Sequence, residues 1–313
     1  MSEPPHIAVL IPCLDEAMTV AKVIGDFRRA LPDAAIFVYD NGSSDDTVAV
    51  ARAAGAQMGR EKRRGKGYVV ATMFDEVDAD IYVLVDGDDT YPAEEVHALL
   101  QPVLDGRADM VVGNRLRRFA EGSFRPAHQF GNRLVVGAIN LAFGSRLEDV
   151  MSGYRVLRRD LVERVPVVSR GFEIETELTL QTLRRDFVIT EVPIPYRGRP
   201  PGSHSKLNTL RDGVRVLVKI VDVLKAYRPL LFFFMLGVAL ALVGAALGAA
   251  PMVDVLATGH SARVLPALLA VTAEVIAVML VVCGLVLDGL NHRLEEVERA
   301  AQRSHRSRGR ASP

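Results

Sequence analysis

The sequence predicts an α/β fold, a doubly wound and mostly parallel sheet, followed by an interfacial amphipathic helix and two transmembrane helices. Three observations predict it. In the first 200 residues, short apolar runs alternate with segments of helical periodicity, the order typical of parallel sheets with helices on both faces. A basic amphipathic stretch follows, and two long apolar runs come after it. Basic and acidic residues number 38 each, so no excess of charge indicates a nucleic-acid partner.

The strands and helices of the predicted sheet follow one another along the first 113 residues. Strands are predicted over 6–12, 34–40, 81–86 and 108–113, and helices over 16–31, 45–55, 66–77 and 93–104. The second helix has Asp45 or Asp46 as a cap at its start and ends at Gly55. In such a sheet the carboxyl ends of the strands share one edge, and ligands bind there.

Polar residues collect at these strand ends. They are Pro12, Asp15 and Glu16 after the first strand, Asp40 to Gly42 after the second, Asp86 and Asp88 after the third, and Gly113 to Arg115 after the fourth. One such cluster is also compatible with a helix cap or a solvated turn, but four of them indicate a site at the carboxyl edge. Carboxylates in an Asp-x-Asp pattern suit Mg²⁺ or Mn²⁺, which bind one or two carboxylates together with substrate phosphates.

A glycine-containing segment, RRGKGYVV at 63–70, is expected to touch phosphate. It combines glycines that allow close approach, the cation Lys66 and the start of a helix. The sequence has neither G-x-x-x-x-G-K-[ST] nor a G-x-G-x-x-G after the first strand, which argues against a P-loop and against dinucleotide binding.

Two apolar runs indicate membrane spans. Residues 229–253 contain no charged residue, residues 264–287 contain only Glu274, and each run exceeds the roughly 20 residues that cross a bilayer. A buried core helix is the weaker alternative for runs of this length. Lys and Arg flank the pair at 219–228 and 293–310, so the positive-inside rule places both termini in the cytoplasm. We therefore expect an integral protein of the cytoplasmic membrane with a cytoplasmic catalytic domain.

The segment 206–228 between the soluble part and the spans is predicted to be an amphipathic helix in the membrane interface. A helix packed on the soluble domain is the alternative. The expected organisation is a catalytic domain at 1–205, this helix, a two-span region at 229–290 and a basic cytoplasmic tail at 291–313. The first residues lack the basic and apolar regions of a signal peptide.

Six segments carry a resemblance to a known family. In order, IPCLDE, VYDNGSSDDT, RGKG, VDGDDTYPAE, GNR and DVMSGYRVL resemble the family 2 glycosyltransferases of the GT-A fold. The most similar branch is the dolichyl-phosphate-mannose-synthase-like, polyprenyl-phosphate glycosyltransferases, and the resemblance covers residues 6–215. It implies a membrane-bound, inverting enzyme that moves a sugar from a nucleotide sugar to a polyprenyl phosphate and forms a β-linked product.

The resemblance also implies the residues of the site. The donor residues are Pro12, Glu16 and Asp40 at the base and ribose, Asp86 and Asp88 at the metal and diphosphate, Glu175 or Glu173 near the donor, and Arg199, Ser205 and Lys206 in a loop that closes over the diphosphate. Asp149 is implied at the sugar or the acceptor. Two alternatives stay open: 150–157 as only a turn into a strand, and Glu175, Glu177 and Thr179 as a solvated helix face.

Two departures from the family pattern fall around the donor. Asp-Gly-Asp-Asp-Thr-Tyr stands where mannosyl and glucosyl members have Asp-Ala-Asp-Leu-Gln, and Asn41 stands where many relatives have a second Asp. We therefore expect a UDP-sugar, with glucose or N-acetylglucosamine, in preference to GDP-mannose.

The acceptor chemistry directs attention to arginines. A phosphomonoester has its second pKa at about 6, so it attacks the anomeric carbon in line without a strong general base. Arg binds phosphate in a bidentate manner. Arg115 and Arg133, and next Arg125, are expected to hold the acceptor phosphate, and Asp88 and Asp149 complete the expected catalytic set. Arg117 and Arg118 are expected to be surface charges.

Other functions stay open at this stage. A GT-A enzyme acting on a glycan, a protein or another lipid shares the same motifs, and a non-enzymatic membrane scaffold needs only the spans. The absence of Trp argues against a processive polysaccharide synthase, which carries Gln-x-x-Arg-Trp. A homo-oligomer is compatible with the sequence.

Overall fold

The computed structural model describes residues 4–119, 126–169, 171, 173–198, 218, 221–260 and 262–309, without the side chains of 117–119, 126–131 and 295–309. Of the predicted site residues, Arg125, Arg199, Ser205 and Lys206 lie outside this part, as does most of the predicted helix 206–228. The chain divides into two compact units between Val216 and Leu217, and each unit is described by itself.

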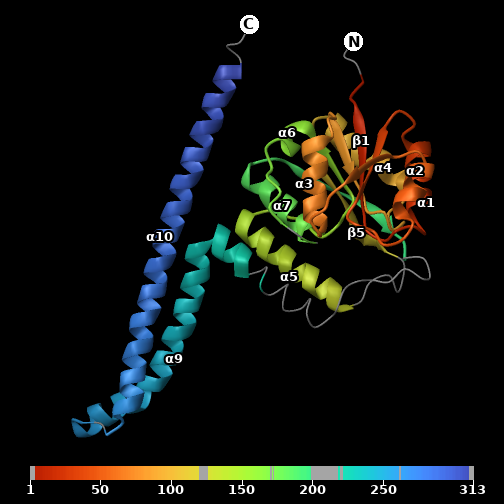
Figure 1. Cartoon of the computed structure of the whole chain (residues 1–313). Coiled ribbons are helices and arrows are strands. Elements are labelled where there is room, and N and C mark those ends of the chain that lie inside the picture. The colour runs from red at the N-terminus through yellow and green to blue at the C-terminus, as the bar shows by residue number, and fades with distance from the viewer. Residues whose placement is uncertain are drawn as a thin grey trace. The chain divides into compact units, whose positions relative to one another are not determined.

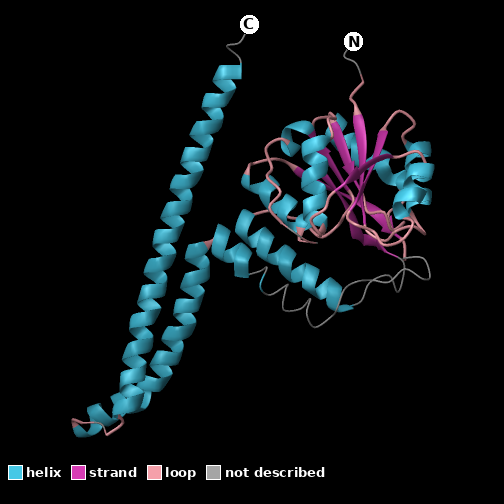
Figure 2. Cartoon of the chain, viewed as in Figure 1, coloured by secondary structure: helices cyan, strands magenta, loops and turns pink. Residues whose placement is uncertain are grey.

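One sheet organises the first unit (Figures 1 and 2). Its strands among the described residues are β1 (Ile7–Cys13), β2 (Ala35–Asp40), β3 (Gln57–Arg60), β4 (Ile81–Leu84), β5 (Met110–Phe119), β6 (Arg155–Arg158) and β7 (Ile189–Tyr196), in the order β3-β2-β1-β4-β6-β5-β7. Only β6 runs antiparallel to its neighbours in this sheet, so the other strands end at a common carboxyl edge. The prediction of a mostly parallel α/β sheet is confirmed.

Helices cover both faces of the sheet (Figure 1). The helices of this unit are α1 (Val20–Ala30), α2 (Thr47–Ala53), α3 (Lys66–Glu76), α4 (Val96–Leu104) after a 3-10 turn at Ala93–Glu95, α5 (Pro126–Phe143), α6 (Arg159–Val162) and α7 (Ile174–Arg184). α5 lies beyond the ends of the strands and not on a face of the sheet (Figure 1). α1, α2 and α4 contribute to one buried apolar cluster, and α3, α6 and α7 contribute to a second.

The alternation of side chains along β1 explains the two clusters. Val9 and Ile11 belong to the first cluster, whereas Ala8 and Leu10 belong to the second, because successive side chains of a strand point to opposite faces. All four are fully buried. A strand covered on both faces therefore appears in the sequence as an unbroken apolar run.

The structure contains α5, α6 and β7, which were not predicted, and it departs from the predicted elements at three further places. β3 was not predicted, because Gln57–Arg60 carries one large apolar side chain and pairs only along β2. β5 continues to Phe119, so Arg115 projects from the strand and does not follow its end. The segment 150–157 is indeed a turn into a strand, β6, and that strand reverses direction relative to β4.

The second unit contains α9 (Pro229–Thr258) and α10 (Val264–Gly309), which pack against each other. In the described part of the chain, Pro229–Thr258 and Val264–Leu294 are the two stretches long and apolar enough to cross a membrane. α10 continues without a break through the predicted border at residue 290. Of the predicted amphipathic helix 206–228, residues 218 and 221–228 are described: 218 and 221–227 are helical, and Arg228 is not.

Candidate active site

The polar residues predicted at the strand ends lie at the carboxyl edge of the sheet. Asp40 is the last residue of β2 and pairs in register with Cys13 at the end of β1. Asp86 and Asp88 follow β4, the neighbour of β1 on its other side. Lys66, the first residue of α3, donates to Asp86 and also to Glu175 in the first turn of α7, so both helices begin at this edge.

Lys66 joins two carboxylates from distant parts of the chain. Its Nζ lies 2.5 Å from Oδ1 of Asp86 and 2.5 Å from Oε1 of Glu175. The side chains of Lys66 and Glu175 are 10% and 7% exposed, and that of Asp86 is 28% exposed. Burial alone would lower the pKa of Lys66, but the two carboxylates raise it above its ordinary value. The ammonium therefore stays charged and offsets the repulsion between Asp86 and Glu175.

Asp88 is held in a tight turn beside them. It is 3% exposed, and its Oδ1 accepts hydrogen bonds from the backbone N–H of Thr90 at 3.2 Å and from the Thr90 hydroxyl at 2.6 Å. In the part of the chain that the structure describes, no group of three or more His, Cys, Asp or Glu side chains is placed to enclose a metal. Mg²⁺ and Mn²⁺ often bind one or two carboxylates plus substrate phosphates, so Asp86 and Asp88 fit a cation completed by a diphosphate.

Asn41 ties the end of β2 to the glycine-containing loop before α3. Its Oδ1 accepts the N–H of Gly65 at 2.7 Å, and its Nδ2 donates to the carbonyls of Arg63 at 2.8 Å and Glu61 at 3.1 Å. Gly65 has φ 137, which disfavours any residue with a Cβ. An Asp at position 41 has no N–H to donate to the two carbonyls. The departure from the family pattern at Asn41 thus fixes the loop that delivers Lys66.

Asp40 shapes the neighbouring turn. Its carboxylate accepts the backbone N–H groups of Gly42 at 3.0 Å and Ser43 at 2.9 Å, and its residue is 4% exposed. Pro12 lies in β1 opposite Tyr39, the residue before Asp40, and Glu16 lies in the loop after β1, where its backbone N–H donates to the Thr47 hydroxyl at 2.8 Å. Of the two predicted cap residues, Asp46 occupies the N-cap position of α2 without a side-chain cap bond, and Oδ1 of Asp45 accepts the N–H of Thr47 at 3.0 Å.

Arg115 and Asp149 form a buried ion pair. Nε and Nη2 of Arg115 donate to the two carboxylate oxygens at 2.8 and 2.9 Å, and the Arg115 backbone N–H donates at 3.1 Å. The Asp149 side chain is 0% exposed and that of Arg115 is 13% exposed. Burial alone would raise the pKa of Asp149, but Arg115 lowers it below its ordinary value, so the carboxylate is ionised at neutral pH. Asp149 thus orients Arg115, the member of the pair that reaches the surface.

Tyr91 connects the two halves of the site. Its hydroxyl accepts the N–H of Gly153 at 2.9 Å and accepts from Nη1 of Arg115 at 3.4 Å. Its ring packs edge-on against Tyr154 and Tyr196. Burial raises the pKa of Tyr91, so the hydroxyl stays protonated. The turn that carries Asp86 and Asp88 is therefore coupled to the Asp149–Arg115 pair.

Arg155 holds the turn after Asp149 from inside the protein. It is fully buried and donates to the carbonyls of Val150 at 2.7 Å and Ser152 at 2.9 Å, and to the Thr179 hydroxyl at 3.0 Å. Burial lowers the pKa of its guanidinium to about 10, which leaves it charged at neutral pH. Because Thr179 belongs to α7, the turn and the helix that carries Glu175 are held together.

The other predicted site residues differ in their exposure to solvent. Arg133 is exposed on α5. Glu175, Glu177 and Thr179 are 6%, 9% and 0% exposed, so the solvated-face alternative is wrong. Sequence reasoning assigned no role to Tyr91 or Arg155. The only sequence signal for them was their position in two of the family segments, Tyr91 in VDGDDTYPAE and Arg155 in DVMSGYRVL. Neither residue belongs to a periodic or charge pattern that indicates a role.

Gly153 offers a test of this geometry. A Cβ built on it would lie 2.5 Å from Oδ2 of Asp86, which is closer than real Cβ contacts. Gly153→Ala is therefore expected to displace the Asp86 carboxylate and to lower kcat/KM by about 100-fold. Gly137→Ala on α5, where an added Cβ would meet no described atom within 4 Å beyond its chain neighbours and its own helix backbone, is the control and should leave kcat/KM unchanged. Steady-state kinetics of both variants measure the effect. If Gly153→Ala is as active as wild type, the close approach of the Gly153 backbone to the Asp86 carboxylate is contradicted.

Sequence comparison identifies similar proteins. The family "Glycosyl transferase family 2" matches residues 8–165. The chain is 33% identical over 240 residues to "Glycosyltransferase AglJ" of Haloferax volcanii, covering 76% of this chain and 78% of that protein. It is 30% identical over 217 residues to "Dolichyl-phosphate hexose transferase" of the same organism, covering 69% of this chain and 93% of the relative.

Comparison of structures supports the fold. The structure of a glucosyl-3-phosphoglycerate synthase from Mycobacterium tuberculosis, in complex with Mn²⁺, UDP-glucose and phosphoglyceric acid, aligns with a TM-score of 0.59. The alignment is 24% identical and covers 70% of this chain and 79% of that one. At this identity the likeness shows the fold, a GT-A arrangement of strands and helices.

Proposed function

The chain belongs to glycosyltransferase family 2, and from that premise we propose that it transfers a sugar from a nucleotide sugar to a polyprenyl phosphate. One relative is a dolichyl-phosphate hexose transferase, and the similarity covers 93% of its length. The described part of the chain also contains two helices long and apolar enough to cross a membrane. Those helices suggest membrane association, and we propose that the enzyme works at the cytoplasmic face of the membrane, with both termini in the cytoplasm.

The observation that carries the proposal is the division of the site into an acidic and a cationic half. Asp86 and Asp88 suit a cation that carries a diphosphate, and Arg115 offers a guanidinium for a second anionic group. Tyr91 joins the halves through one hydroxyl. A donor diphosphate and an acceptor phosphate are two anions that must meet at one place, and this arrangement provides for both.

A divalent cation, Mg²⁺ or Mn²⁺, fits the acidic half and, when bound, would offset the charge of the leaving diphosphate. The same fold holds Mn²⁺ with UDP-glucose in the M. tuberculosis enzyme. Lys66 lies against Asp86 and adds a fixed positive charge on the same side. Pro12, Glu16 and Asp40 are proposed at the base and ribose, and Glu175 near the donor.

The chain's own residues then account for the transfer. Arg115 binds and aims the lipid phosphate, while Asp149 keeps the guanidinium oriented and stays ionised. The lipid phosphate is itself an anion at neutral pH, so no side chain needs to remove a proton from it. Attack on the face opposite the diphosphate inverts the anomeric centre and gives a β-linked product from an α-linked donor.

A UDP-sugar is the proposed donor, in preference to GDP-mannose. The proposal depends on the departures at Asn41 and in the Asp86–Asp89 turn, both of which lie beside the donor half of the site. Competition by nucleotides tests it: UDP should inhibit transfer at concentrations at least about tenfold below GDP, a difference of 1.4 kcal/mol in binding free energy. Equal or stronger inhibition by GDP contradicts the UDP-sugar and leaves the acceptor class untouched.

A further inference from the structure

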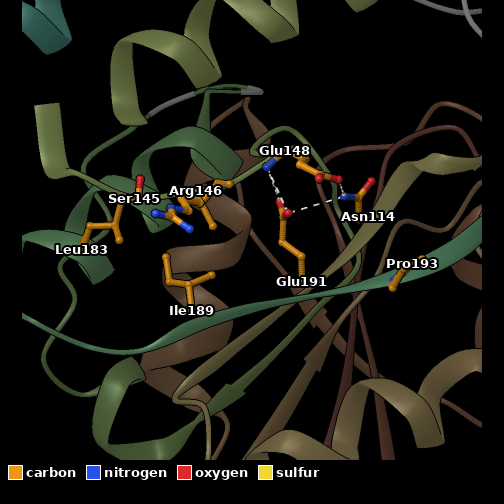
Figure 3. A pocket seen from close by; sticks show the side chains of 9 residues that line it. Asn114, Ser145, Arg146, Glu148, Leu183, Ile189, Glu191 and Pro193 are labelled. Carbon is orange, nitrogen blue, oxygen red and sulfur yellow. Dashed lines mark hydrogen bonds between the residues drawn. The ribbon is translucent and has the colours of Figure 1, made fainter. Parts of the chain in front are cut away.

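Glu191 on β7 lies behind the Asp149–Arg115 pair, in a pocket of about 420 Å³ lined also by Asn114, Arg146 and Glu148 (Figure 3). Both of its carboxylate oxygens accept the backbone N–H of Glu148 at 3.0 Å, and Oε1 accepts the N–H of Asp149 at 2.7 Å. The family motifs did not include this residue, and the transfer described above does not use it.

The surroundings of Glu191 disfavour a charged carboxylate, apart from the backbone N–H groups that donate to it. Burial raises the pKa of Glu191, and the neighbouring Asp149 and Glu148 carboxylates raise it further, against the backbone N–H groups that lower it. Asn114 lies between the two glutamates: its Nδ2 donates to Oε2 of Glu148 at 2.9 Å and to Oε2 of Glu191 at 3.4 Å (Figure 3). A strand that only needed to pack would carry an apolar residue here at lower cost.

Asp149 is consequently held at both ends. Glu191 holds its backbone N–H, and Arg115 holds its carboxylate through two side-chain hydrogen bonds. Asn114, the residue before Arg115 in β5, belongs to the same network. A change at Glu191 therefore reaches the guanidinium through one intervening residue, with hydrogen bonds of 2.7 to 2.9 Å at each step.

We propose that Glu191 is a positioning residue for sugar transfer, which fixes the backbone at 148–149 and thereby sets the direction in which Asp149 aims Arg115. The inference rests on the proposed function, because it takes Arg115 as the residue that binds the acceptor phosphate.

Glu177 provides a matched control within the same chain. Its two carboxylate oxygens accept the N–H of Val168 at 3.1 Å, and Oε2 accepts the N–H of Ser169 at 2.7 Å. Glu177 thus makes the same pattern of backbone bonds as Glu191, but to a loop that does not contain Asp149. Replacing either glutamate with Gln keeps one acceptor oxygen but removes the other one and the negative charge, which weakens a comparable set of bonds. Only one of the two sets leads to Arg115.

The test is a double-mutant cycle on the full-length protein in lipid vesicles. Glu191→Gln and Glu177→Gln are each measured alone and combined with Arg115→Lys, which keeps the ion pair with Asp149 but loses the bidentate geometry. Glu191→Gln is expected to lower kcat about 10-fold, with the donor KM unchanged, and to cause no further loss in the Arg115→Lys background. Any loss from Glu177→Gln should be the same factor in both backgrounds.

The inference is overturned if Glu191→Gln lowers kcat by the same factor with and without Arg115→Lys, because its effect is then independent of Arg115. Hydrogen exchange gives a second readout that needs no turnover. Glu191→Gln should speed the exchange of the amides of 148 and 149, and Glu177→Gln only those of 168 and 169. Unchanged exchange at 148 and 149 also overturns the inference, whereas wild-type protein inactive on polyprenyl phosphate overturns the proposed function alone.

Discussion

Replacing Asp88 with Asn is expected to lower kcat by about 100-fold or more while the protein still folds and enters the membrane. In wild type, Oδ1 of Asp88 accepts hydrogen bonds from the backbone N–H and the hydroxyl of Thr90, which hold the turn after Asp86. An Asn side chain keeps an oxygen that can accept these bonds. What is lost is the charge for a cation and its diphosphate.

Asp89→Asn is the matched control, one residue further along. Asp89 has φ 58, a conformation that Asn tolerates, and its carboxylate pairs with the half-exposed Lys22 at 2.6 Å. Its loss should lower kcat by less than about 5-fold, as for other ion pairs near the surface. Kinetics over a range of Mg²⁺ and Mn²⁺ concentrations make the comparison. Full turnover by Asp88→Asn, or by wild type in EDTA, contradicts a metal-assisted transfer.

Arg115→Lys is expected to lower kcat/KM for the lipid acceptor by about 10- to 100-fold, with donor affinity nearly unchanged. Lys retains the charge beside Asp149, so the buried carboxylate is not left without a cation, which would itself destabilise the fold by about 3–5 kcal/mol. The loss therefore reports the bidentate geometry and not the stability of the pair.

Arg133→Lys tests which of the two arginines expected at the acceptor phosphate, Arg115 or Arg133, contributes to binding it. Arg133 is exposed on α5, and Lys there keeps a mobile charge at the surface. Its effect should be smaller than that of Arg115→Lys by at least about 5-fold, since an exposed cation contributes little. Acceptor kinetics and thermal unfolding are measured for both. The reverse order, with Arg133→Lys the more damaging, assigns the phosphate to α5 and not to β5.

The sequence predicted the sheet because its strands are local apolar runs and its helices have local periodicity. It missed β3, whose four residues carry one large apolar side chain, and it did not predict β7. It did not foresee that β6 reverses direction, because this depends on pairing with β4, which lies far earlier in the chain. The two apolar helices were predicted from length and composition, which are again local properties.

For the site, the sequence predicted residue types at strand ends but not their partners. Lys66 and Glu175 are 109 residues apart, and no periodicity signals their ion pair. Arg155 is a charged residue in a turn motif, and sequence alone favours solvent for it, yet the fold encloses it completely. Glu191 lies in an edge strand where alternating polar residues are ordinary, so only its bonds to the 148–149 backbone distinguish it.

One measurement tests most directly whether the acceptor is a polyprenyl phosphate. Purified full-length protein in vesicles is given a labelled UDP-sugar with a polyprenyl phosphate, or with the polyprenyl alcohol of the same length, and lipid-linked label is counted. Because we propose that Arg115 binds an anion that attacks without a general base, we predict transfer to the phosphate at least about 100-fold faster than to the alcohol. Equal rates with the two lipids, or label found only in a glycan or a protein, would contradict the account.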